Sequence, residues 1–252
     1  TDEGREIHAC KMKEKYYPLS FSSLKEFAKS PAHFIAYKNK QKTDTAAMRF
    51  GTAVHSAVLE PQKFELEYLP TDLRRNTKAY KALVDDNPSK TFLTGSDWTA
   101  IKRIKSNLKG CQMAYDLLSG CNKIEQLVTG TIEGIEFRGF VDAMNTDYMI
   151  DFKTTQNGSP KEFGRSAFNF SYYLQAAIYR ELTGVQDFWI VTAESQSPYT
   201  ITPYILSEEY LERGRVELMS LISDFKAWNG EAIGYAGSEE HEFFVLNAPN
   251  WA

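Results

Sequence analysis

Residues 133–155 read E-G-I-E-F-R-G-F-V-D-A-M-N-T-D-Y-M-I-D-F-K-T-T. β-Branched and aromatic residues dominate both halves of this segment, and Asn145-Thr146-Asp147 supplies the residue types of a tight turn. The pattern predicts two antiparallel strands, Ile135–Met144 and Tyr148–Thr154. We therefore interpret the rest of the chain around this hairpin.

The charged residues of the hairpin have a definite predicted geometry. If the turn contains only Thr146-Asp147, Asp142 lies directly opposite Asp151, and Lys153 shares the face of Asp151. Like charges on cross-strand neighbours, about 5 Å apart, destabilise a sheet. A bound Mg²⁺ or Mn²⁺ would stabilise the pair, and Lys153 would then stabilise developing negative charge or orient a water. The alternative is an ordinary polar hairpin face in which Lys153 neutralises two aspartates, and a three-residue turn would spoil the pairing.

Composition limits the classes of protein that remain. The chain has 252 residues and is 42% hydrophobic, so it can bury a large core. No apolar run reaches transmembrane length, and no signal peptide is recognisable near the first residue. Cys10, Cys111 and Cys121 form no paired motif, which favours a reduced, cytoplasmic protein. A net charge of −4 argues against a generally basic nucleic-acid-binding protein but allows a local basic groove.

The first half of the chain is predicted to be mainly helical. Leu19–Tyr37 suggests two short helices broken at Ser30-Pro31. In Thr45–Glu60, an apolar stripe at helical spacing predicts a helix that Pro61 ends, with His55 beside the stripe. Taken alone, His55 is more typical of a core-edge histidine than of a ligand. Residues 65–95 are polar and mixed, which favours a solvated surface over a mobile loop above a site, and Asp97–Leu108 is a basic amphipathic helix.

The second half alternates strands and helices around the hairpin. We treat the chain as one domain, residues 1–252, with a helical portion at 19–119, a catalytic sheet core at 120–230 and a tail at 231–252. The predicted elements are a strand at Asn122–Thr131 that includes Glu125, a short helix from Ser159-Pro160, a helix at Phe170–Leu182, strands at Phe188–Ala193 and Tyr199–Ile205, and a long helix at Ser207–Trp228.

Several motifs together resemble a known family. G-F-V-D, followed after eight residues by D-F-K, resembles the core of the PD-(D/E)xK nuclease superfamily, although Gly-Phe-Val precedes Asp142 where some members have proline. I-D-F-K-T-T at 150–155 resembles the I-D-x-K-T motif of its RecB-like and RecE-like branch. G-T-A-V-H-S-A-V-L-E-P at 51–61 resembles the histidine helix of RecE-like exonucleases (exodeoxyribonuclease VIII type). With the segment at 19–34 and Y-Y-L-Q-A-A-I-Y at 172–179, these matches occur in the family's order.

The resemblance implies a fold and a set of site residues. The fold would be α/β, a restriction-endonuclease-like core in which helices flank a central mixed sheet, with a helical N-terminal part. Lys153 would activate or position the attacking water, and Gln175 and Tyr179 would support the site or contact DNA. The implied metal ligands are His55, Asp142, Asp151 and the backbone carbonyl of Phe152; the implied catalytic residues are Lys153, Asp151, Asp142, Glu125 and Gln175; the implied DNA contacts are Arg49, Arg165, Tyr172, Gln175 and Tyr179.

The resemblance also implies a function. The protein would be an exonuclease that uses one or two Mg²⁺ (or Mn²⁺) ions and degrades linear double-stranded DNA from 5′ to 3′. It would leave 3′ single strands for a single-strand annealing protein of the RecT-like type. A ring-shaped homotetramer, phage or prophage origin and a bacterial cytoplasmic location are expected. The alternatives are another PD-(D/E)xK nuclease, such as a single-strand exonuclease or a CRISPR-associated enzyme, and a catalytically inactive DNA-binding module.

Overall fold

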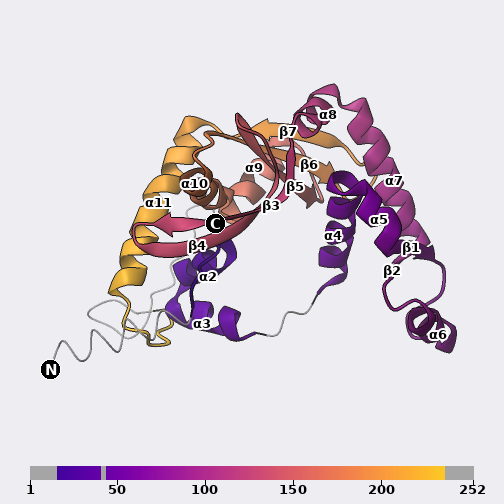
Figure 1. Ribbon diagram of the computed structural model, residues 1–252, viewed down its shortest axis with the longest axis horizontal. Coiled ribbons are helices and arrows are strands. Elements are labelled where there is room, and N and C mark those ends of the chain that lie inside the picture. Colours follow the sequence, from indigo (N-terminus) through magenta and orange to yellow (C-terminus); the bar gives the residue numbers. More distant parts are fainter. Residues whose placement is uncertain (1–15, 41–43, 236–252) are drawn as a thin grey trace, which may run out of the picture. The chain divides into compact units, whose positions relative to one another are not determined.

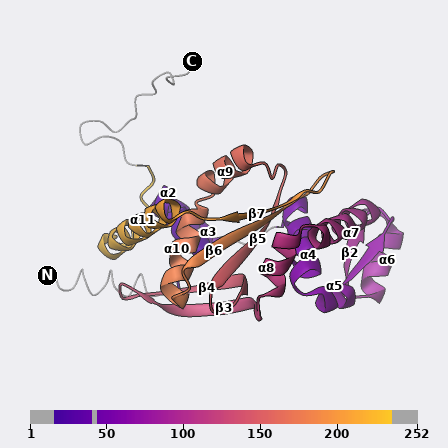
Figure 2. The same ribbon diagram turned by 90° about the horizontal axis from the view of Figure 1, so that it is seen from above.

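The computed structural model describes residues 16–40 and 44–235 (Figures 1 and 2). Cys10 and the part of the predicted tail beyond residue 235 lie outside the described residues. The chain divides into two compact units. The first contains Thr1–Gln41, Gly130–Arg138 and Val216–Ala252, and the second contains Lys42–Thr129 and Gly139–Arg215. The single-domain interpretation stays a prediction.

A five-stranded mixed sheet carries the hairpin. Its strand order is β3-β4-β5-β6-β7. The parallel pair, β5 and β6, is joined through two helices, as a parallel connection requires, while β4–β5 and β6–β7 are antiparallel. This arrangement confirms the predicted α/β fold with a central mixed sheet. The strands are β3 (Lys123–Ile132), β4 (Ile135–Met144), β5 (Tyr148–Thr155), β6 (Asp187–Glu194) and β7 (Ile201–Ile205).

The register of the central hairpin agrees with the sequence prediction. Ala143 pairs with Ile150 across β4 and β5, so the turn contains two residues, Thr146-Asp147. Continued by one residue, this register places Asp142 opposite Asp151, as the two-residue turn predicts. The ladder itself ends at Ala143–Ile150, and the side chain of Asp142 accepts the backbone N–H of Phe152, the residue after Asp151.

Helices cover the sheet on both faces. Residues of α4, α7 and α8 form a core with β5 and β6, while α10 supplies side chains to the opposite face. Ser171, with φ 57°, separates α9 from α10, and Phe170 caps the C-terminus of α9. The predicted start of the second helix at Phe170 is therefore wrong, because α10 begins at Tyr172. The helices outside the first 40 residues are α4 (Ala46–Leu59), α5 (Pro61–Glu67), α6 (Lys78–Asp86), α7 (Gly95–Gly110), α8 (Gln112–Ser119), α9 (Pro160–Asn169), α10 (Tyr172–Thr183) and α11 (Glu208–Ala227).

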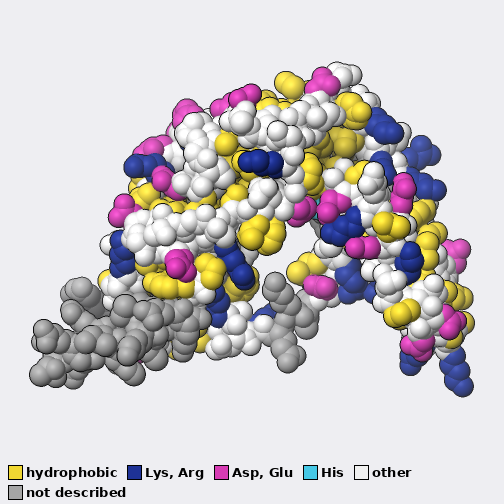
Figure 3. Space-filling view, viewed as in Figure 1, with side chains coloured by type: hydrophobic (Ala, Val, Ile, Leu, Met, Phe, Trp, Pro, Cys, Tyr) yellow, Lys and Arg dark blue, Asp and Glu magenta, His cyan; other side chains and the backbone are white. Residues whose placement is uncertain are grey.

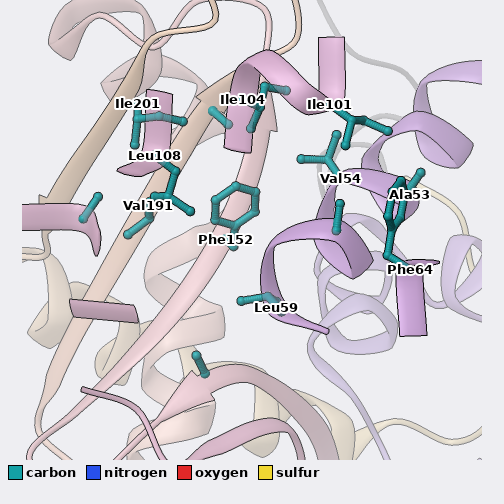
Figure 4. Close-up of a cluster of buried hydrophobic side chains, with 14 of the residues drawn as sticks. Ala53, Val54, Leu59, Phe64, Ile101, Ile104, Leu108, Phe152, Val191 and Ile201 are labelled. Atoms are coloured by element: carbon teal, nitrogen blue, oxygen red, sulfur yellow. The ribbon is translucent and has the colours of Figure 1, made fainter. Parts of the chain in front are cut away.

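The core of the second unit fixes the position of α4 on the sheet. Ala53 and Val54 of α4 are fully buried against Ile101 of α7, and Phe152 of β5 belongs to the same cluster (Figure 4). Small residues at helical spacing let α4 approach the sheet closely. The predicted apolar stripe is thus confirmed, and the packing of α4 brings His55 against Phe152 of β5.

Residues 65–95 contain structure that the sequence did not reveal. Strands β1 (Tyr68–Thr71) and β2 (Thr91–Thr94) form a separate parallel pair, and α6 lies between them in the chain. Each strand has four residues, which is too short for a readable alternation. Helix α8 also escaped prediction because only Cys111 separates it from α7.

The first unit is organised by aromatic residues. Helices α2 (Phe21–Lys29) and α3 (Pro31–Asn39) meet at Ser30, which confirms the predicted break. Phe27, Phe34 and Phe225 pack edge to face with one another, and Trp228 completes the cluster. In the described part of the chain, no helix combines the length and the apolar character needed to cross a membrane.

Candidate active site

Asp151 lies at the centre of a charged cluster on β5. Its side chain is buried, and its Oδ1 accepts hydrogen bonds from Lys153 Nζ at 2.7 Å and from Gln175 Nε2 at 2.8 Å. Lys153 Nζ is also 2.7 Å from Oδ2, but only Oδ1 is reached in hydrogen-bond geometry. Oδ2 is buried and has no hydrogen-bond partner among the described residues. A buried carboxylate oxygen that accepts no hydrogen bond is costly, so Oδ2 remains able to accept a hydrogen bond or to bind a metal ion.

Asp142 faces this carboxylate from β4. Its Oδ2 accepts the backbone N–H of Phe152 at 2.7 Å, so a side chain binds the amide of β5 where a backbone carbonyl would continue the ladder. This hydrogen bond holds the carboxylate of Asp142 against β5. Burial, and then the nearby charge of Asp151, raise the pKa of Asp142 to about 7.

His55 and Glu125 approach Asp142 from two further elements. His55 Nδ1 of α4 lies 3.7 Å from Asp142 Oδ2 and 4.0 Å from Glu125 Oε1 of β3. The His55 ring also packs edge-on against Phe152, with centroids 5.4 Å apart. Glu125 has φ 47°, a left-handed conformation that costs about 1–3 kcal/mol in a non-glycine residue. This strain accompanies a glutamate that joins the charged cluster.

The electrostatics of the cluster follow from these contacts. Burial alone would lower the pKa of His55, but the nearby carboxylates of Glu125 and Asp142 outweigh it and raise that pKa. Burial also opposes the charge of Lys153, yet Asp151 and Asp142 raise its pKa above the ordinary value. Lys153 is therefore a fixed ammonium group that can donate to an anionic oxygen.

The donor set fits a hard divalent cation. One ligand atom from each of His55, Glu125 and Asp142 lies within 4.8 Å of the others. Two ligands that share one Mg²⁺ at about 2.1 Å lie about 3.0–4.2 Å apart, which matches the distances from His55. Asp151 Oδ2, which accepts no hydrogen bond from the described residues, adds a further acceptor. This grouping differs from the predicted ligand set, because it includes Glu125 and leaves Asp151 just outside.

Two side chains of helix α10 support the strands that carry the charged cluster. Gln175 and Tyr179 are buried, and the Tyr179 hydroxyl donates to the carbonyl of Phe140 at 2.9 Å. The sequence left open whether Gln175 and Tyr179 support the site or contact DNA. These contacts favour the supporting role for both residues. Tyr172 is half-buried, and Lys153 Nζ stands 5.2 Å from the centre of its ring.

The two arginines that were predicted to contact DNA lie outside the cluster. Arg49, on α4, donates to the backbone carbonyl of Asp44 at 2.7 Å. Arg165, on α9, is exposed and lies 3.3 Å from Glu162. A role in DNA binding stays a prediction for both.

A hairpin that presents two aspartates and a lysine beside a histidine helix defines a domain of the PD-(D/E)xK type. Residues 20–242 match the family described as "PDDEXK-like domain of unknown function (DUF3799)", and the chain belongs to that family. The predicted resemblance to the PD-(D/E)xK superfamily is thus confirmed. No curated protein matches the chain.

One solved structure shares the fold, and two others are more distantly similar. A protein from Eubacterium rectale, described as a candidate exonuclease, is 16% identical, with 94% of each chain covered and a TM-score of 0.61. A phage-related exonuclease from Haemophilus somnus is 14% identical over 60% of this chain and 82% of its own, with a TM-score of 0.34. An alkaline exonuclease from Laribacter hongkongensis is 13% identical over 70% of this chain and 93% of its own, with a TM-score of 0.30.

Metal affinity is expected to rise with pH. His55 and Asp142 both have raised pKa values, near 7 for Asp142, and both must lose their protons to bind a cation. Titration calorimetry with Mn²⁺ should therefore give tighter binding at pH 8 than at pH 6, with protons released at the lower pH. Equal affinity at the two pH values would contradict the assignment of these side chains as ligands.

Proposed function

We propose that this protein is a metal-dependent nuclease that hydrolyses phosphodiester bonds in DNA at the Asp142–Asp151–Lys153 cluster. One observation carries the proposal. The buried carboxylate of Asp151 and the partly buried carboxylate of Asp142 lie on adjacent strands, with Lys153 on Asp151, and one oxygen of Asp151 has no hydrogen-bond partner among the described residues. Such an arrangement is unfavourable in itself and becomes favourable around a divalent cation.

The residues divide into those that would hold the metal and those that act on the substrate. His55, Glu125 and Asp142 would bind Mg²⁺ or Mn²⁺, with Asp151 as a further ligand. When bound, the metal lowers the pKa of water and stabilises charge on a phosphoryl oxygen. The protonated Lys153 donates to the anionic phosphate or orients the attacking water. As the water oxygen bonds to phosphorus, the bond to the leaving sugar oxygen breaks and that oxygen takes up a proton.

The finer assignment is an exonuclease that degrades linear double-stranded DNA from 5′ to 3′. The described exonuclease function of the Eubacterium rectale protein, which shares the fold over 94% of both chains, supports action at ends. The RecE-like motifs support the polarity, a 3′ single-stranded product for an annealing protein of the RecT-like type, and a ring-shaped homotetramer. They also support phage or prophage origin and action in the bacterial cytoplasm.

The polarity is tested with linear duplex DNA that carries a label at either the 5′ or the 3′ end. Incubation with Mg²⁺ should release the 5′ label at once, while the 3′ label stays in long products. Early release of the 3′ label would agree with nuclease activity but would refute the 5′ to 3′ direction. Absence of any Mg²⁺-dependent release would refute the nuclease itself.

Gln175 is expected to act by positioning Asp151. Its amide donates to Oδ1 in a buried contact, so Gln175→Ala should let the carboxylate rotate. We expect nuclease activity to fall about 10–100-fold, as for other residues that orient metal ligands. Steady-state kinetics should show the loss mainly in kcat, with KM for DNA nearly unchanged. Loss confined to KM would indicate that Gln175 contacts the DNA instead.

A further inference from the structure

Residues 72–90, which join β1 to β2 and contain α6, differ in charge from the rest of the chain; we name them the α6 arm. The arm carries five lysines and arginines against three aspartates and glutamates, a net charge of +2, whereas the whole chain has a net charge of −4. In Figure 3, dark blue side chains lie over α7 and α6 at the right-hand edge. The exposed cations of the arm are Arg74, Arg75, Lys78 and Lys81.

These four cations have no acidic partner in the part of the chain that the structure describes. None of them lies in an ion pair there, although ion pairs occur elsewhere, such as Lys63 with Glu60 at 2.9 Å. Four cations within eight residues repel one another. Their clustering raises the free energy of the arm unless an anion is bound.

The charges of α6 also oppose its own dipole. Lys78 begins the helix and no acidic residue stands in its first turn, while Asp85 and Asp86 end it. Helices are stabilised by the reverse arrangement. Helix α7 shows that favourable arrangement, with Asp97 in its first turn and Lys109 in its last. Lys109 thus stabilises the C-terminal turn of α7. No basic residue of α6 stabilises its own helix in this way.

The packing of the arm gives no other reason for its charge. No residue of α6 is buried, and Tyr80 contacts Phe92 of β2 with ring centroids 6.1 Å apart. The arm therefore contributes little to the core, and its cations face solvent. A polyanion along the start of α6 would remove the mutual repulsion and reverse the unfavourable dipole interaction.

We propose that the α6 arm binds the phosphate backbone of double-stranded DNA. The inference rests on the proposed function, which makes DNA the substrate. Proteins that hold single strands use exposed aromatic rings for base stacking, but the only ring of α6, Tyr80, packs against Phe92. Charge without a stacking surface fits a duplex backbone.

The position of the arm defines which part of the substrate it contacts. β1 and β2 pack against α7, which packs on the helix that carries His55. Within this second unit, α6 lies at the far end from β5 (Figures 1 and 2). The arm thus binds the intact duplex at a distance from the phosphodiester bond that is cut.

The test measures duplex binding without hydrolysis, in the Asp151→Asn background with chelator present. Fluorescence anisotropy with a labelled blunt duplex is recorded over a range of KCl concentrations. The variant R74Q/R75Q/K78Q/K81Q should bind about 10²–10³-fold more weakly at ~0.1 M salt, and its salt slope should fall by about 2–4. The control K102Q/R103Q/K105Q/K109Q removes the same charge from α7 and should have a much smaller effect.

A second measurement uses the unsubstituted arm. Hydrogen exchange of the amides of α6 should slow when the duplex is added, because the bound phosphates stabilise the helix. Undiminished duplex affinity in the arm variant, an equal loss in the α7 control, or an equal loss of single-strand binding would each overturn the proposal. If the wild type digests DNA in the end-label assay while the arm variant keeps its affinity, this inference alone fails. If the arm variant loses duplex affinity but the wild type digests no DNA, the proposed nuclease function fails and the assignment of the arm as a DNA-binding surface holds.

Discussion

Replacing Asp151 with asparagine should abolish nuclease activity while the protein stays folded. Asp151 has a buried carboxylate oxygen that accepts no hydrogen bond from the described residues, and its other oxygen accepts one from Lys153 at 2.7 Å. An amide lacks the negative charge that binds a cation and fixes the ammonium group. A metal site contributes several kcal/mol to stabilising the transition state, so we expect a rate loss of at least about 10³-fold. Release of acid-soluble nucleotides from linear duplex DNA measures it.

The matched control is Asp147→Asn in the turn of the same hairpin. Asp147 is exposed and lies outside the charged cluster, so this variant should keep wild-type activity. Circular dichroism should show the same helix and strand content for both variants. A fully active Asp151→Asn variant, or equal losses in the two variants, would contradict the assigned site.

Replacing Asp142 with asparagine should have opposite effects on stability with and without metal. An amide oxygen can still accept the N–H of Phe152, but the repulsion from Asp151 disappears. Without metal, we expect the variant to be more stable than the wild type at pH 8 by about 1–2 kcal/mol, or roughly 2–8 °C in Tm for a chain of this size. With saturating Mn²⁺ the wild type should gain Tm and the variant should gain little.

The pH dependence of this difference follows from the raised pKa of Asp142. The wild type folds with Asp142 protonated well below pH 7 and loses stability as the pH rises from the unfolded value near 4 to the folded value of about 7. The advantage of the variant should therefore be absent at pH 4, grow up to about pH 7 and then level off. Calorimetric scans in chelator at several pH values measure it. A variant that is less stable than the wild type at pH 8 would show that the two carboxylates do not repel each other in the folded protein.

The sequence predicted the central hairpin because its information is local. The alternation of Asp151, Phe152 and Lys153 and the short turn at Thr146-Asp147 specify face and register together, and the structure shows both. The helix of His55 was equally readable from its apolar spacing. The ligand role of that histidine needed the family resemblance, because spacing alone does not tell which end of a helix meets a sheet.

Other parts of the site depend on distant contacts and could not be read in the same way. Glu125 has a positive φ, and its side chain lies close to His55. A glutamate within a strand-like sequence pattern does not predict a positive φ. The parallel pairing of β1 with β2 joins two four-residue strands separated by the α6 arm. Only the folded chain shows that the basic residues of this arm have no acidic partners among the described residues.

Nuclease action at DNA ends is tested by comparing linear and covalently closed circular duplex DNA of the same sequence in the presence of Mg²⁺. We expect steady release of nucleotides from the linear form, none from the circle, and none from either after chelation of the metal. Digestion of both forms at the same rate would contradict action at DNA ends. Linear DNA that stays intact in the presence of Mg²⁺ would show that this site is not a nuclease.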